Sequence, residues 1–268
     1  MIVDKINQYL YENELIIDEA IYYEIQKIAG ATFKRQFMEN KEKDGTGKIW
    51  FSQVGKCARQ LAYQYHGVEK QGKEIDGRAK LIFWTGDLIE LTIVGLAQLA
   101  GVVITGTGLQ QIRKEIPING GSISGRPDGV VFADDGNYLL EVKSMSSFRF
   151  REFEKGIIDE TYLAQINIGM HALHLDKCVI VGYNKDNGVM HEIIKEKDEN
   201  ILQQARENVM SVLHSTPESL PEPAYKANDK GHYPWQCLYC AWWGHCRKNA
   251  EKVLVGKSYK LREKEEAA

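Results

Sequence analysis

The segment that decides the fold runs from Ser122 to Lys143 and reads SISGRPDGVVFADDGNYLLEVK. It contains two β-rich runs, 122–132 and 138–143. Between them lies Asp134-Asp135-Gly136-Asn137, a turn sequence typical of a β-hairpin. The segment therefore predicts two strands that pair about this turn.

Three polar residues of the hairpin suit metal-dependent chemistry. Because side chains alternate across a strand, Glu141 and Lys143 share one face, and pairing about the turn brings Asp128 close to Glu141. Two carboxylates suit a hard divalent cation. A lysine beside them can orient water or stabilise charge on a phosphate. The alternative is an exposed hairpin with a surface Glu–Lys pair.

The spacing Asp128-x(12)-Glu141-x-Lys143, after a Gly-x-x-Asp turn, resembles the catalytic signature of the PD-(D/E)XK nuclease superfamily. The resemblance implies that Asp128 and Glu141 bind Mg²⁺ or Mn²⁺ and that Lys143 assists the attacking water. It also implies the Val142 carbonyl as a candidate further metal ligand.

Two flanking motifs agree with this resemblance. Gly86-Asp87-Leu88-Ile89-Glu90 is similar to the G-x-x-x-(H/E) motif, which implies that Glu90 is a metal ligand. The CRISPR-associated nucleases usually carry histidine there, and glutamate is more similar to the lambda-exonuclease branch. Tyr162-Leu163-Ala164-Gln165 resembles the helix with a Q-x-x-x-Y motif that contacts DNA. Gln165 matches it, but Gly169 stands where the tyrosine is expected.

The chain has five cysteines, and this odd number favours metal ligation over a disulfide framework. One early cysteine, Cys57, precedes the late group Cys237-x-x-Cys240-x(5)-Cys246. This pattern resembles the iron-staple nucleases, namely the CRISPR-associated RecB-like nucleases and the nuclease domain of the AddB helicase subunit. The resemblance covers roughly 52–246 and implies a four-iron, four-sulfur cluster held by these four thiolates. By analogy with disulfides, closing so long a loop could contribute on the order of 5 kcal/mol.

Zinc is the alternative for the late cysteines, with His232 or His245 in place of a thiol. The fifth cysteine, Cys178, lies in an apolar run and is expected to be buried. Three tryptophans near the late cysteines are expected to shield the cluster: Trp235, Trp242 and Trp243.

The order of elements predicts an α/β fold: a PD-(D/E)XK, restriction-endonuclease-like core with a helical N-terminal extension and a cysteine-rich iron–sulfur C-terminal cap. We expect a single nuclease domain, 1–268, with a helical part (1–100), a catalytic core (101–215), the cap (216–250) and a charged, frayed tail (251–268). The expected helices are 17–38, 52–65 with Ser52 as N-cap, 78–100, 161–175 and 199–214. The other expected strands are 102–105, 109–118, 178–184 and 189–195.

Charge gives no support to nucleic-acid binding, because the formal net charge is −3. Any DNA contact must therefore come from a local patch. Phe148-Arg149-Phe150-Arg151 could stack bases and neutralise phosphates of a single strand. The alternative is a helix start with its phenylalanines packed inward. No apolar run is expected to be long enough to span a bilayer, and no export pattern is evident. We therefore expect a cytoplasmic protein without a membrane partner.

The family resemblance implies a metal-dependent DNA exonuclease that prefers single strands. One rival is a lambda-exonuclease-like enzyme acting on duplex ends, and another is a non-catalytic DNA-binding subunit of a larger complex. Helicase, recombination or CRISPR adaptation proteins are the candidate partners.

Overall fold

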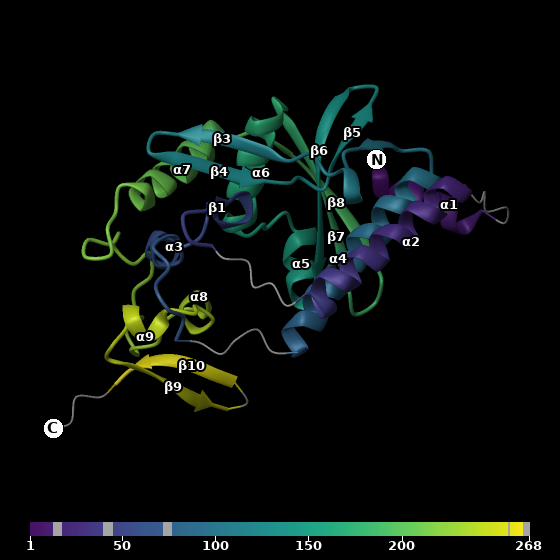
Figure 1. The fold of residues 1–268 in the computed structure, drawn as a ribbon. Helices are drawn as coiled ribbons and strands as arrows, with labels where there is room; N and C mark the ends of the chain where they lie inside the picture. The colour runs from purple at the N-terminus through teal and green to yellow at the C-terminus, as the bar shows by residue number, and fades with distance from the viewer. Residues whose placement is uncertain (13–17, 40–44, 72–76, 257, 265–268) are drawn as a thin grey trace.

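The centre of the fold is a five-stranded mixed sheet with strand order β2-β5-β6-β7-β8 (Figure 1). The computed structural model describes residues 1–12, 18–39, 45–71, 77–256 and 258–264. Strands β6 and β7 run parallel, and the other neighbouring pairs are antiparallel. A parallel pair needs a crossover connection, which here contains helix α6. The strands are β2 (Val103–Thr105), β5 (Gly129–Ala133), β6 (Gly136–Met145), β7 (Lys177–Asn184) and β8 (Met190–Glu196).

Alternation along the strands gives the sheet two apolar faces, each covered by helices. Leu140 and Val142 pack with Ile93 of α4 and with α1 on one face. Leu139 packs with Ile166 of α6 and with α5 on the other. Helix α2 lies beside α4 in Figure 1 and continues as a π-helical stretch, Lys34–Met38. These helices are α1 (Ile2–Tyr11), α2 (Glu19–Phe33), α4 (Gly77–Leu99), α5 (Ser147–Glu154) and α6 (Glu160–Leu173).

A second, smaller sheet has strand order β1-β4-β3 and packs with α3 and α7. The prediction of one strand over 122–132 is wrong, because β4 and β5 belong to different sheets. The break falls at Pro127, which has no N–H to donate to a ladder and is therefore excluded from a central strand. The elements of this region are β1 (Ile49–Trp50), α3 (Ala58–Tyr65), β3 (Lys114–Ile118), β4 (Gly121–Gly125) and α7 (Glu199–Leu213).

Two other predicted elements begin later than expected. Residues Phe51–Gln53 form a 3₁₀ turn, and α3 begins at Ala58 with Cys57 as its N-cap, so Ser52 is not the cap. The chain bends at Gly55, where an added Cβ would lie 2.7 Å from the backbone of Thr161. Strand β3 begins only at Lys114, because Gly108–Gln110 form another 3₁₀ turn.

The remaining predicted helices and the strand pair β7–β8 are confirmed within a few residues. The described part of the predicted 17–38 helix is α2 with its π-helical continuation; its first residue lies outside the described residues. Helix α1 was not predicted, although Ile2 and Ile6 are buried in the core.

The predicted frayed tail is instead a β-hairpin over 250–263, formed by β9 (Ala250–Val255) and β10 (Ser258–Glu263). Strand β10 packs against α8 (Trp235–Leu238), and Leu261 is fully buried. Together with α9 (Trp243–Cys246), these elements make up what we call the cysteine cap, residues 216–256 and 258–264. In Figure 1 it lies at the opposite end of the molecule from the N-terminus. The last predicted tail residues, 265–268, lie outside the described part of the chain.

Helix α4 corrects the expectation that no run is long enough to cross a membrane. Its 23 residues are long and apolar enough to do so by length and composition. The same test is passed by core helices, and α4 packs against α1, α2 and β6. It also carries two acidic residues, Asp87 and Glu90.

Candidate active site and cysteine pocket

The candidate active site lies where β6 loses its partner. Pairing with β5 stops at Gly129 and Leu140, so the next part of β6 has a free edge on that side among the described residues. The Val142 amide donates to Asp128 Oδ2, at 2.8 Å, instead of to a strand carbonyl. Because the N–H and C=O of one strand residue point to the same side, the Val142 carbonyl faces this free edge too.

Glu141, Lys143 and Gln165 form one hydrogen-bonded group beside that edge. Glu141 is only 3% exposed. Its Oε1 lies 2.5 Å from Lys143 Nζ and accepts a hydrogen bond from Gln165 Nε2 at 2.8 Å. The Gln165 amide also accepts from Lys143 Nζ at 3.4 Å. Strand β6 and helix α6 thus bring together three of the residues expected to be catalytic.

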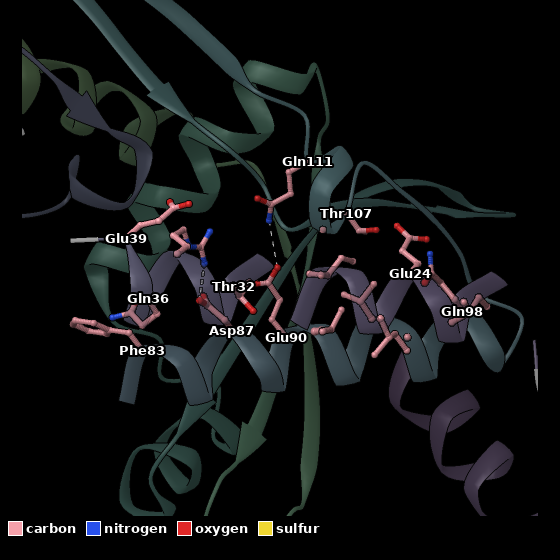
Figure 2. Close-up of a pocket in the computed structure, with 18 of the residues that line it drawn as sticks. Glu24, Thr32, Gln36, Glu39, Phe83, Asp87, Glu90, Gln98, Thr107 and Gln111 are labelled. Atoms are coloured by element: carbon pink, nitrogen blue, oxygen red, sulfur yellow. Dashed lines mark hydrogen bonds and ion pairs between the residues drawn. The ribbon is translucent and has the colours of Figure 1, made fainter. Parts of the chain in front are cut away.

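Glu90 approaches the same place from α4. Its Oε1 accepts a hydrogen bond from Gln111 Nε2 at 3.3 Å (Figure 2). Burial, and then the negative charge of Glu141, raise the pKa of Glu90 to about 7. Burial, followed by the charges of Glu141 and Glu90, also raises the pKa of Asp128 well above its usual value. Glu141 is therefore close enough to both Glu90 and Asp128 for its charge to oppose their ionisation.

Lys143 is the cation of this group. Burial lowers its pKa, but the charges of Glu141 and Asp128 outweigh that effect and raise the pKa above its usual value. The ammonium group also lies 4.6 Å from the centre of the Tyr162 ring. Lys143 is therefore protonated near neutral pH and acts as a fixed positive charge.

Each carboxylate is engaged with a protein donor in this conformation. Among the described residues, no three His, Cys, Asp or Glu side chains are grouped so as to hold a metal ion. The donor set nevertheless suits a hard cation, because carboxylate and backbone carbonyl oxygens are its preferred ligands. A cation would also relieve the mutual repulsion that raises the pKa values of Asp128 and Glu90.

A cavity of about 740 Å³ lies between α2 and α4, and Glu90 forms part of its wall (Figure 2). The wall carries both signs of charge, with Arg35 and Asp87 paired at 2.7 Å. The carboxylate of Glu90 is thus reachable from a large opening.

Two residues of this site were missed by sequence reasoning. Gln111 is one, and no motif marks it. Tyr162 is the other: it occurs in the quoted helix motif, but three residues before Gln165 and not four after. At the expected tyrosine position, Gly169, an added Cβ would lie 3.0 Å from Leu139. A tyrosine at that position would meet Leu139 of β6 unless Leu139 shifted.

The four cysteines expected to bind a cluster line one pocket in the structure. Cys57 comes from the start of α3, and the other three come from the cysteine cap. The Cys57 sulfur accepts a hydrogen bond from the Ala224 amide at 3.4 Å. Cys178 is fully buried on β7 and does not line this pocket. Residues far apart in the sequence therefore present their thiols to the same space.

The three thiols of the cysteine cap are poorly suited to ionise by themselves. Burial first, and then the neighbouring thiols, raise the pKa values of Cys237 and Cys240 to about 11. Burial also raises the pKa of Cys246. Nearby arginines act in the opposite direction, Arg247 beside Cys237 and both Arg247 and Arg59 beside Cys246. A thiolate group here needs a positively charged centre among the sulfurs.

The residues proposed to complete a zinc site lie elsewhere. Neither His232 nor His245 lines the pocket, and His245 Nε2 is 3.0 Å from the Glu69 carbonyl. Of the three tryptophans expected to shield the sulfurs, Trp243 lines the pocket. Trp242 is buried against α3 and donates to the Val68 carbonyl, whereas Trp235 is 50% exposed and lies outside the pocket. Among the three tryptophans, Trp243 is thus the one that lines the pocket, and the shielding role of Trp235 and Trp242 stays a prediction.

No family model and no curated protein sequence matches this chain. Among solved structures, it is similar to SSO0001, with 20% identity, a TM-score of 0.44, and coverage of 81% of this chain and 93% of that one. It is also similar to the alkaline exonuclease LHK-Exo from Laribacter hongkongensis (18%, TM-score 0.46, 63% and 87%). A third is a phage-related exonuclease from Haemophilus somnus 129PT (12%, TM-score 0.41, 62% and 92%). Similarities at this level assign neither a family nor a function.

Proposed function

We propose that the chain is a metal-dependent DNA nuclease of the PD-(D/E)XK type. The observation that carries this proposal is the meeting of Asp128, Glu141 and Glu90 with a protonated lysine at the free edge of β6. Three carboxylates in a half-buried place without a bound cation destabilise one another. Such an arrangement is favoured where a divalent cation binds, and Mg²⁺ or Mn²⁺ matches the oxygen ligands.

The cation would be held by the three carboxylates and the Val142 carbonyl. When bound, it activates water and offsets charge on the scissile phosphate. Lys143 contributes a positive charge aimed at a phosphate oxygen; its raised pKa makes it unsuited to act as a base. Gln165 fixes Glu141 and Lys143 relative to each other through its two amide atoms.

The resemblance in sequence favours exonuclease action on single strands, and the duplex-end enzyme is the competing proposal. Glu90 at its position favours the duplex-end enzyme, and the cysteine pattern favours the single-strand enzyme. The non-catalytic subunit is disfavoured, because such a protein has no need of a lysine held against buried carboxylates. DNA is the substrate in either enzyme, and we propose that 1–268 acts as one domain in the cytoplasm.

For the cysteine pocket we propose a four-iron, four-sulfur cluster. In such a cluster each thiolate binds a different iron, so the sulfurs lie farther apart than around one zinc ion, where each Zn–S bond is about 2.3 Å. Four cysteines that line one pocket supply the number of thiolates that such a cluster takes. Its role here is structural: it would tie α3 to the cysteine cap.

The test is cleavage of end-labelled single-stranded and duplex DNA in Mn²⁺, with product ladders read from both ends. We expect wild-type protein to cleave and Glu141→Gln to be inactive. A matched control is Glu207→Gln, the same change at an exposed position on α7. Wild-type protein that binds DNA but never cleaves it in Mn²⁺ or Mg²⁺ would support the non-catalytic subunit instead.

A further inference from the structure

Three exposed side chains meet between the candidate active site and the cysteine cap. The Arg149 guanidinium carbon lies 6.0 Å from the centre of the Phe148 ring and 5.9 Å from that of the Trp235 ring. Phe148 is 61% exposed and Trp235 is 50% exposed. What sets these two rings apart is that both lie against one exposed arginine, an arrangement that can form a binding surface. We call Phe148, Arg149 and Trp235 the aromatic platform.

Helix α5 holds its part of the platform rigidly. Phe150 and Phe153 are buried in the core beneath the helix, each 2% exposed. At the start of the helix, the Ser147 amide and hydroxyl both donate to Asp186 Oδ2 at 2.7 Å. With its inner side fixed in this way, α5 presents Phe148 outward. The sequence expectation for this motif is therefore divided: one phenylalanine is exposed and Phe150 is packed inward.

The third member of the platform comes from the cysteine cap. Trp235 opens α8 and precedes Cys237 by two residues. Phe148 follows Lys143 by five residues, on the chain that leaves β6. The platform thus connects α5, which follows the strand that carries Lys143, with the cysteine cap, which carries three of the four pocket cysteines.

We propose that the aromatic platform binds single-stranded nucleic acid, with bases stacked on Phe148 and Trp235 and a phosphate paired with Arg149. Bases of a single strand expose their faces, whereas those of a duplex are stacked on one another. An arginine between two rings supplies the local positive charge that the acidic chain lacks overall. This inference deepens the proposed function, because it names the part of the surface that selects single strands.

Glu152 competes with a phosphate for Arg149 in the free protein. Its carboxylate lies 2.8 Å from Arg149 Nη1, one turn along α5. A phosphate must compete with this exposed ion pair, which is weak in water. Replacing Glu152 by glutamine removes the competing charge and keeps a side chain of the same size.

The experiment measures fluorescence anisotropy of a labelled oligothymidine and of a matched duplex, in EDTA at one fixed salt concentration. Phe148→Ala, Trp235→Ala and Arg149→Glu are each expected to weaken single-strand binding about tenfold, and Glu152→Gln to strengthen it about twofold. Trp235→Phe keeps a ring and should lose less than Trp235→Ala. Duplex affinity should change less than threefold for Phe148→Ala and Trp235→Ala.

Arg151→Glu is the matched control. It makes the same charge change on the same helix, but its side chain leaves α5 about 160° away from Arg149. Wild-type single-strand affinity in Phe148→Ala and Trp235→Ala would overturn the proposal, as would an equal loss from Arg151→Glu. Melting temperatures separate unfolding from lost binding, and Trp235→Phe decides if Trp235→Ala does not fold. Binding is measured without metal, so it does not depend on cleavage. If the wild-type protein binds single strands through the platform but cleaves no DNA, the proposed nuclease is refuted and this inference stands.

Discussion

The carboxylate site and the cysteine pocket bring together acidic groups in two different ways. At the carboxylate site, Glu141 and Lys143 are neighbours on one strand, and the lysine is an internal cation 2.5 Å from Glu141. At the cysteine pocket, α3 and the cysteine cap are far apart in the sequence but contribute to one pocket, and arginines lie beside the thiols. The first site should therefore fold without the proposed metal, whereas the second should depend on the proposed cluster. Loss of a ligand should affect activity in one and stability in the other.

The largest effect is expected from Glu141→Gln. It removes the charge that holds both Lys143 and a cation, so cleavage in Mn²⁺ should fall on the order of 10³-fold. The fold should persist, because glutamine retains the hydrogen-bonding oxygen that faces Gln165. Cleavage rates on end-labelled DNA test the loss of activity, and chemical denaturation of the same sample tests whether the fold persists. Near-normal cleavage would refute the role of Glu141, and unfolding would refute the contrast between the two sites.

Cys57→Ala, unlike Glu141→Gln, should lower the stability of the fold. Without this ligand the cluster cannot tie α3 to the cap, and the free energy of unfolding should drop by about 3–5 kcal/mol by analogy with a long-range cross-link. Iron content and visible absorbance should fall together with it. Cys178→Ala is the control: it should keep the iron and lose only the packing of a buried thiol. A colourless wild-type protein with one zinc per chain would overturn the cluster.

Much of this contrast could be predicted from the sequence, because strand alternation and motif spacing are local properties. They place Glu141 beside Lys143, whereas the assignment of Cys57 to the other three cysteines came from the resemblance to the iron-staple nucleases. The split of 122–132 into two sheets was missed because both halves are β-rich, although Pro127 marks the break. Helix α1 and the β9–β10 hairpin were missed for another reason. Both are short elements at the ends of the chain, and they are stabilised by tertiary packing of Ile2, Ile6 and Leu261.

Glu90→Gln tests how much the negative charge of Glu90 destabilises the folded protein. A carboxyl whose folded pKa is raised destabilises the fold as pH rises from its ordinary value of 4.5 to its folded value of about 7. In EDTA, Glu90→Gln should therefore match wild type at pH 4 and exceed it by about 2 kcal/mol at pH 8, after allowance for partial exposure. Denaturation at a series of pH values measures this. A pH-independent difference would mean that the pKa of Glu90 is not raised in the folded protein.

The smallest effect is expected at Tyr162. Its ring faces the Lys143 ammonium at 4.6 Å, a contact of about 0.5–1 kcal/mol. Tyr162→Leu should slow cleavage about two- to fivefold, whereas Tyr162→Phe, which keeps the ring, should be close to wild type. Single-turnover rates at saturating Mn²⁺ separate the two. Equal losses would assign the effect to the hydroxyl group instead of the ring.

The short connection at 126–128 also constrains which changes of chain length this protein can accept. It is bounded by Gly125 and Gly129, where an added Cβ would lie 2.1 Å from Phe51 and 2.9 Å from Thr107. One inserted residue would move Asp128 away from the Val142 amide. The turn at 134–135 is exposed, and residues added there leave the strand register intact. Descendants of this chain should therefore vary in length at the turn and keep the connection constant.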